Sequence, residues 1–150
     1  MYRLLGIVIL LLAVNCKSTE NKAKMVEENV ILIGEGNLYG SGSEGIEQQN
    51  LVITSESEWK ELLTKMDSVN KVSDSFSQTE IDFSKYSIIA VFDAVKNSGG
   101  HSLELDINET KNKVLVKVKR KSPEGMATMV MTQPYYIVKI PESETPIVFE

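Results

Sequence analysis

The apolar positions between residues 55 and 66 have the period of an amphipathic helix. They fall at i, i+3, i+4 and i+7, at Trp59, Leu62, Leu63 and Met66. Ser55, with Glu58 three residues later, forms a capping-box pattern that marks the helix start. We therefore expect one principal amphipathic helix here, with Trp59 anchoring it to a sheet.

Most other periodic segments have the pattern of β-strands. Residues 86–95 are almost continuously apolar, which indicates a central strand buried on both faces. Residues 103–107 and 114–118 alternate apolar and polar side chains, which predicts a hairpin with one wet side. Further strands are expected at residues 29–34, 50–54, 126–134, 135–141 and 146–150. The pattern predicts an α+β fold: a mainly antiparallel β-sheet or sandwich of about six or seven strands with one principal amphipathic helix.

A glycine-rich stretch separates the first two expected strands. Five of the nine glycines lie between Gly34 and Gly45, so we expect a mobile loop or a wide hairpin there. Gly34 and Gly36 begin a pattern like that of dinucleotide-binding loops, but Tyr39 stands where the third glycine would be. The stretch therefore predicts no phosphate site.

The N-terminal residues have the features of a signal peptide. Arg3 is followed by an uncharged run, Leu4–Val14, which is too short to span about 30 Å of hydrocarbon. The only cysteine, Cys16, comes soon after this run, and Ala13 stands three residues before it, as in a bacterial lipobox. We expect residues 1–15 to be a lipoprotein signal peptide and Cys16 to carry acyl chains such as palmitate. The alternative is an ordinary secretory signal with a chance cysteine near the cleavage site.

The segment that follows Cys16 is polar and rich in lysine and glutamate. Such a composition does not bury enough apolar surface to offset the entropy of ordering, so residues 16–28 are expected to be a flexible tether. Residues 29–150 have the length of a single α+β domain. The expected localisation is the bacterial cell envelope, with a lipid anchor in the outer membrane and the domain on the periplasmic face or the cell surface.

The charge balance excludes one class of partner. The chain has 16 Lys and Arg against 21 Asp and Glu, a formal net charge of −5. Nucleic-acid binders neutralise phosphates with clustered basic residues, so we expect no nucleic-acid partner. The dense basic run Lys117–Lys121 lies in a strand pattern and is interpreted as a solvated face. Membrane attachment is expected through the acyl chains on Cys16.

The only histidine, His101, raises the question of nucleophilic catalysis. Ser98 and Ser102 flank it, and Asp93 or Asp106 would have to orient its ring. In strand geometry, Ser102 would point away from His101. We therefore expect no catalytic residue.

Metal and cofactor sites are not predicted either. A zinc site needs several Cys or His ligands, and the chain has one of each. The oxygen-rich turn after Asp106 lacks the spacing and mid-loop glycine of an EF-hand. A calcium ion or a small ligand elsewhere is left open.

The second half of the chain resembles a known family. The segments "SEWKELL", "IDFSKYSIIAVF", "KNSGGHSLELDI", "VLVKVKRKSP" and "MTQPYYIVKIP" follow, in order, the pattern of the C-terminal domain of the PrcB family of protease-complex subunits, over about residues 57–141. The resemblance implies a non-enzymatic envelope lipoprotein that binds and stabilises a surface protease complex. The implied partner is a protein, such as a subtilisin-like protease or its propeptide. The alternatives are a protease-inhibitor-like protein, another ligand-binding lipoprotein, or a small hydrolase that uses the His101 loop.

Two short segments are candidates for partner contact. The residues are Gly99, Gly100, His101, Pro134, Tyr135 and Tyr136. The two glycines are expected to supply positive φ at a turn. Strand alternation sends the two tyrosines to opposite faces, so one is expected in the core and the other at the surface. If the fold is a sandwich, both segments can lie at one end of it.

Overall fold

The computed structural model describes residues 29–150. The expected signal peptide, the tether and Cys16 lie outside the described residues, so those features stay predictions. Within residues 29–150, no helix is long and apolar enough to cross a membrane.

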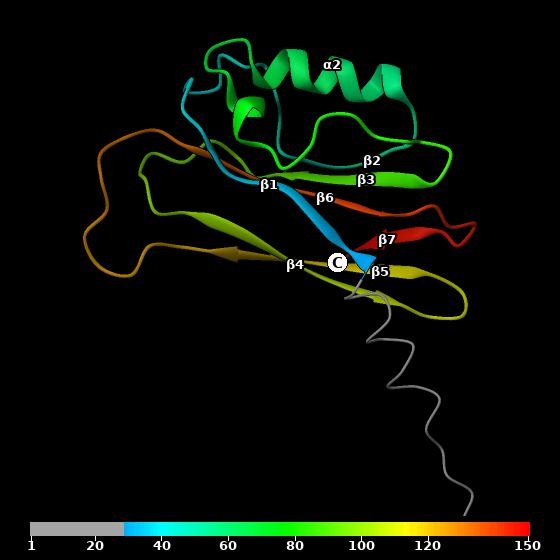
Figure 1. Ribbon diagram of the computed structural model, residues 1–150. Coiled ribbons are helices and arrows are strands. Elements are labelled where there is room, and N and C mark those ends of the chain that lie inside the picture. Colours follow the sequence, from blue (N-terminus) through cyan, green and yellow to red (C-terminus); the bar gives the residue numbers. More distant parts are fainter. Residues whose placement is uncertain (1–28) are drawn as a thin grey trace, which may run out of the picture.

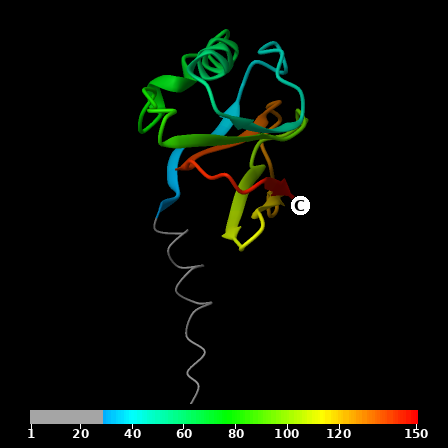
Figure 2. The ribbon, with the colours of Figure 1, turned by 90° about the vertical axis from the view of Figure 1, so that its right-hand side faces the viewer.

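Two β-sheets face each other, and one helix covers the outer face of the larger sheet (Figures 1 and 2). The larger sheet has the order β1-β6-β3-β2, from β1 (Ile31–Leu38), β6 (Gln133–Pro141), β3 (Tyr86–Phe92) and β2 (Gln49–Ile53). The smaller sheet has the order β4-β5-β7, from β4 (Ser102–Glu109), β5 (Val114–Lys121) and β7 (Ile147–Phe149). The helices of this region are α2 (Glu56–Met66) and the short 3₁₀ helix η1 (Val72–Ser75). The expected α+β sandwich with one principal helix is confirmed.

Helix α2 begins and packs as its sequence predicts. The Ser55 hydroxyl accepts a hydrogen bond from the Glu58 backbone N–H, which satisfies a donor that the helix itself leaves unpaired. The apolar stripe faces the larger sheet, where Trp59, Leu62 and Met66 are buried. The tryptophan therefore anchors the helix to the sheet.

Strand β3 lies between two cores, which explains its continuous apolar run. Ile88, Ala90 and Phe92 face the core under α2, whereas Ile89 and Val91 face the smaller sheet. A strand that is covered on both faces has no need of polar positions. The prediction of a central strand buried on both faces is confirmed.

Strands β4 and β5 form the expected hairpin with one wet side. Leu103 and Ile107 point into the core between the sheets. On the outer face, Lys121 pairs with Glu104 at 2.5 Å and Lys119 pairs with Asp106 at 2.7 Å. The C-terminal strand β7 adds to β5 in parallel, so the last apolar run does pair with a strand of the smaller sheet.

Two expectations about loops were wrong. Residues 126–132 do not form a strand but belong to a loop that ends at Thr132, and Gln133 and Pro134 are the first two residues of β6. Gly34 and Gly36 lie inside β1, so the glycine-rich loop is shorter than expected. Gly34 lies under the Phe76 ring, and a Cβ there would come within 2.5 Å of Phe76 Cδ1. This glycine therefore allows close packing and does not indicate mobility.

Candidate functional site

Two long connections meet at one end of the sandwich, on the left of Figure 1. One is the β3–β4 loop, residues 93–101, and the other is the β5–β6 loop, residues 122–132. Lys96 and Thr132 exchange two backbone hydrogen bonds, of 2.7 and 3.0 Å, and Gly99 N–H donates to the Thr128 carbonyl at 3.0 Å. The Thr132 hydroxyl also donates to the Ser98 carbonyl at 2.9 Å. The two loops are thus joined along their length.

The glycine pair makes this junction possible, but by two different means. Gly100 has φ +82°, a left-handed conformation that favours glycine, whereas Gly99 is not among the residues with positive φ. Gly99 is buried, and an added Cβ would lie 2.3 Å from Thr128 Oγ1. The expectation that both glycines supply positive φ was therefore wrong for Gly99, which allows the close approach of the second loop.

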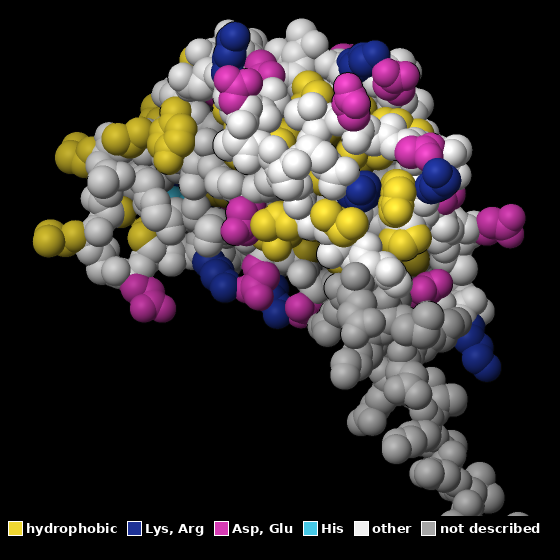
Figure 3. Space-filling model, in the orientation of Figure 1, with side chains coloured by type: hydrophobic (Ala, Val, Ile, Leu, Met, Phe, Trp, Pro, Cys, Tyr) yellow, Lys and Arg dark blue, Asp and Glu magenta, His cyan; other side chains and the backbone are white. Residues whose placement is uncertain are grey.

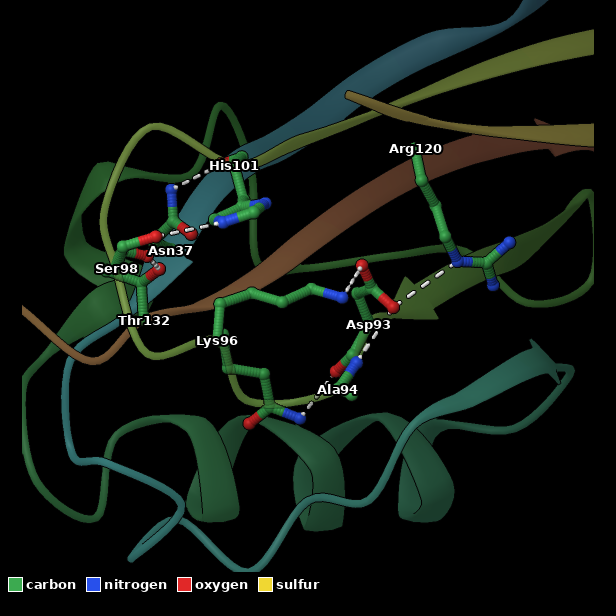
Figure 4. Close-up of polar contacts among 9 residues, drawn as sticks. Asn37, Asp93, Ala94, Lys96, Ser98, His101, Arg120 and Thr132 are labelled. Carbon is green, nitrogen blue, oxygen red and sulfur yellow. Dashed lines mark hydrogen bonds and ion pairs between the residues drawn. The ribbon is translucent and has the colours of Figure 1, made fainter. Parts of the chain in front are cut away.

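A buried aspartate ties this end of the molecule to the smaller sheet (Figure 4). Asp93 is 3% exposed. Its carboxylate accepts hydrogen bonds from Lys96 Nζ at 2.9 Å and from Arg120 Nε at 3.3 Å. Burial alone would raise the pKa of Asp93. The bonds from Lys96, Arg120 and the Ala94 N–H outweigh burial and hold this pKa below its ordinary value. The carboxylate thus stays ionised and joins the two sheets.

His101 makes a serine contact but has no acidic partner in the described chain. Its Nε2 lies 3.1 Å from Ser98 Oγ, and its carbonyl accepts from Asn37 Nδ2 at 3.2 Å (Figure 4). Asp93 pairs with Lys96 and Arg120, and Asp106 pairs with Lys119. Neither of the carboxylates considered for a triad therefore orients the imidazole. The Ser98–His101 contact closes the loop on itself and binds it to β1 through Asn37.

The structure brings only some of the candidate contact residues to the surface. Gly99, Pro134 and Tyr135 are buried, so any part that they play in partner contact is indirect. Gly100 is exposed and His101 is half-buried, both beside the joined loops. Tyr135 packs under α2 against Phe76 and Phe92, whereas Tyr136 is half-buried on the opposite face of β6. Tyr136 lines a hollow together with Ser102 and Leu103, which directly follow His101 in the chain.

The β5–β6 loop carries the exposed apolar side chains that sequence reasoning missed. Met126 and Met129 are essentially fully exposed, at 103% and 98%, and Val130 and Met131 are exposed at 47% and 41%. We name residues 122–132 the methionine loop; its apolar side chains project at the far left of Figure 3. The sequence signal was the run "MATMVM", which was interpreted as part of a strand over residues 126–134. Exposed apolar groups that gather in this way mark interaction surfaces.

The described residues offer little to a metal ion. In residues 29–150, no three His, Cys, Asp or Glu side chains gather in a way that would hold one. The arrangement at the joined loops is suited to contact with a macromolecule: a held loop with an apolar tip and a half-exposed imidazole beside it.

Residues 87–141 match the family model described as PrcB C-terminal. The matched segment runs from β3 to the end of β6 and contains both joined loops and the β4–β5 hairpin. The resemblance to the PrcB family is confirmed over these residues; the part of the expected match from Ser57 to Tyr86, with α2, lies outside them. No curated protein and no solved structure matches the chain.

Proposed function

We propose that this protein is a non-enzymatic binding subunit of a protease complex and that its partner docks on the methionine loop. The observation that carries the proposal is the exposure of Met126, Met129, Val130 and Met131 on one loop. The match to the PrcB C-terminal model supports the class of partner. The protein would bind and stabilise a surface protease, such as a subtilisin-like enzyme or its propeptide.

The methionine loop is held in place and not merely long. Its last residue, Thr132, forms backbone hydrogen bonds with Lys96, and the Thr128 carbonyl accepts a hydrogen bond from the Gly99 N–H. A loop that is already ordered loses less conformational entropy when a partner binds. Methionine side chains are flexible and polarisable, so they adapt to an apolar partner surface. The loop therefore combines a fixed backbone with adaptable side chains.

The proposed interface predicts a specific loss of partner capture. The double substitution Met126→Ser and Met129→Ser should weaken capture from native membranes by at least about tenfold, because it removes two apolar anchors of the interface. Mass spectrometry of the captured proteins should identify a secreted protease or its propeptide with the unsubstituted protein.

The matched control is Tyr39→Ser with Val69→Ser, since these side chains are also exposed, at 59% and 47%, but lie outside the methionine loop. The control should capture as well as the unsubstituted protein. Equal capture by the Met126→Ser, Met129→Ser variant would show that this loop is not the interface. Recovery of no protease component would count against the protease complex.

We also propose that acyl chains on Cys16 hold the protein in the cell envelope, at the outer membrane. Cys16 lies outside the described residues, and the support is its place soon after the apolar run, with Ala13 three residues before it. Cys16→Ser should leave the protein unprocessed or free of the membrane, because it removes the group that carries the acyl chains. Membrane fractionation with intact-mass analysis checks this, with Ser18→Ala as the control. An unlipidated mature N-terminus at another residue would contradict the anchor.

A further inference from the structure

A groove runs along the open side of the sandwich, between the edge strand of each sheet. Strand β1 is an edge of the larger sheet, and β4 is an edge of the smaller one. Two hollows of about 560 and 200 Å³ lie between these strands, and both are lined by Tyr136. They therefore meet at Tyr136, and we name the combined surface the β1–β4 groove. Figure 3 shows apolar side chains on this side of the molecule next to acidic and basic ones.

The two halves of the groove differ in the side chains that line them. Five aliphatic residues line the smaller hollow together with Tyr136 and one acid, Asp106: Val30, Leu32, Leu105, Ile107 and Val138. The larger hollow has charged walls, formed by Glu35, Glu104 and Lys121. An occupant must therefore offer both apolar and charged side chains.

The rim of the groove has an excess of negative charge. Glu104 and Asp106 are paired with Lys121 and Lys119 on β5. Glu35 has no ion-pair or hydrogen-bond partner from its side chain among residues 29–150. Burial raises the pKa of Tyr136, and the charges of Glu35 and Glu104 raise it further, which agrees with a negative potential in the groove.

The backbone edge of β4 faces this groove without a partner strand. Beyond its ladder with β5, no backbone hydrogen bond joins β4 to another segment of residues 29–150. Neither lysine nor proline, which commonly protect edge strands, occurs in its sequence, SLELDINE. The β1 edge is less available, because Ser77 donates from its N–H to the Ile33 carbonyl and from its hydroxyl to the Leu32 carbonyl.

We propose that the β1–β4 groove binds an extended segment of a partner protein that alternates apolar and basic side chains and adds as a strand to β4. Backbone hydrogen bonds to the β4 edge would supply affinity, as in other cases of strand addition. Successive side chains of a strand point to opposite faces. One set would enter the smaller hollow beside Leu105 and Tyr136, and the other would lie beside Glu104 and Asp106.

Charge argues against a second copy of this chain as the occupant. A second β4 strand would bring its own Glu104 and Asp106 next to the same acidic residues, and like charges across a strand pair are unfavourable. Lysine or arginine at these positions would instead meet acidic neighbours. The groove therefore favours a basic segment from a different protein.

This inference goes beyond the proposed function and uses a different surface. The apolar side chains of the methionine loop line neither hollow of the groove. Peptide binding in the groove should therefore survive the Met126→Ser, Met129→Ser variant unchanged, and loss of partner capture at the loop would leave the groove untouched.

The test uses a short fluorescein-labelled peptide that alternates lysine and valine, titrated against the protein and followed by fluorescence anisotropy. We expect saturable binding, with amide chemical-shift changes concentrated in Ser102–Glu109. Glu104→Gln with Asp106→Asn should weaken binding by roughly tenfold, because two acidic neighbours of the added strand are neutralised. A peptide with glutamate in place of lysine, or with proline in place of valine, should bind at least tenfold more weakly.

The matched control is Glu56→Gln with Glu61→Gln on α2. These glutamates also form exposed ion pairs with lysines, so the change in net charge is the same. The proposal is overturned if both double variants lose the same affinity, if the glutamate peptide binds equally well, or if the shift changes map away from β4. Dimerisation of the protein through β4, seen by sedimentation and displaced by the peptide, would overturn the choice of occupant.

Discussion

Replacing Trp59 with alanine is expected to lower the free energy of unfolding by about 3–5 kcal/mol. The indole is 2% exposed, and it stacks on Phe76 with ring centroids 6.4 Å apart and an interplanar angle of 22°. Its Nε1–H donates to the Thr79 carbonyl at 2.7 Å. The substitution leaves a large cavity between α2 and the larger sheet and also removes the donor to Thr79. Urea unfolding followed by circular dichroism measures the loss, since the variant has no tryptophan fluorescence.

Trp59→Phe separates the two causes. Phenylalanine keeps most of the ring packing against Phe76 but cannot donate to the Thr79 carbonyl. We expect it to cost about 1–2 kcal/mol, because one hydrogen bond is lost and the smaller ring fills the site less completely. A loss below about 1 kcal/mol in Trp59→Ala would mean that α2 contributes little to the stability of the fold.

The helix and the buried strands could be predicted because local pattern determines them. The spacing of apolar residues from Trp59 to Met66 and the capping box at Ser55 independently predict the same helix. The apolar run of β3 is typical of a strand that is covered on both faces. In each case, neighbouring residues along the chain carry the signal.

The methionine loop could not be predicted because its conformation depends on a distant loop. Residues 126–131 have the composition of a strand, but no sheet edge pairs with them. The contacts that hold the loop join Thr128 and Thr132 to residues of the β3–β4 loop, about 30 positions earlier in the chain. Periodicity contains no information on such contacts, so the exposure of Met126 and Met129 becomes visible only in the structure.

The placement of the two tyrosines could be predicted only in part, because part of it depends on contacts between segments that are distant in the chain. Strand alternation predicted one buried ring and one at the surface, and the structure assigns Tyr135 to the core and Tyr136 to the β1–β4 groove. The sequence did not indicate that Tyr136 would line a hollow together with Ser102 and Leu103 at the start of β4. That proximity depends on the two-sheet topology, which places β4 in the smaller sheet and β6 in the larger one.

Asp93→Asn is expected to lower the free energy of unfolding by about 2 kcal/mol at neutral pH. The variant loses the negative charge that Lys96 and Arg120 share. The N–H₂ group of its amide would also face one of these two cations. The effect should be smaller than that of breaking a fully buried ion pair, because the side chains of Lys96 and Arg120 are 27% and 44% exposed and can turn to water. Urea unfolding of both proteins measures the difference.

The difference should also depend on pH in one direction. Because the folded-state pKa of Asp93 lies below its ordinary value, the carboxylate stabilises the fold above the unfolded-state pKa of about 3.9. This contribution is lost as the pH falls through the folded-state pKa. The gap between the two proteins should thus be widest near pH 7 and should close at strongly acidic pH.

Asp82→Asn is the matched control, since Asp82 is also paired with a lysine, Lys85 at 2.8 Å, but lies at the surface. It should change stability much less than Asp93→Asn at neutral pH, because exposed ion pairs contribute little. If Asp93→Asn matches this control at every pH, the Asp93 ion pairs do not hold the two sheets together. The backbone hydrogen bonds between Lys96 and Thr132 would then be what holds the two loops together. The methionine loop would keep its position without the charge of Asp93.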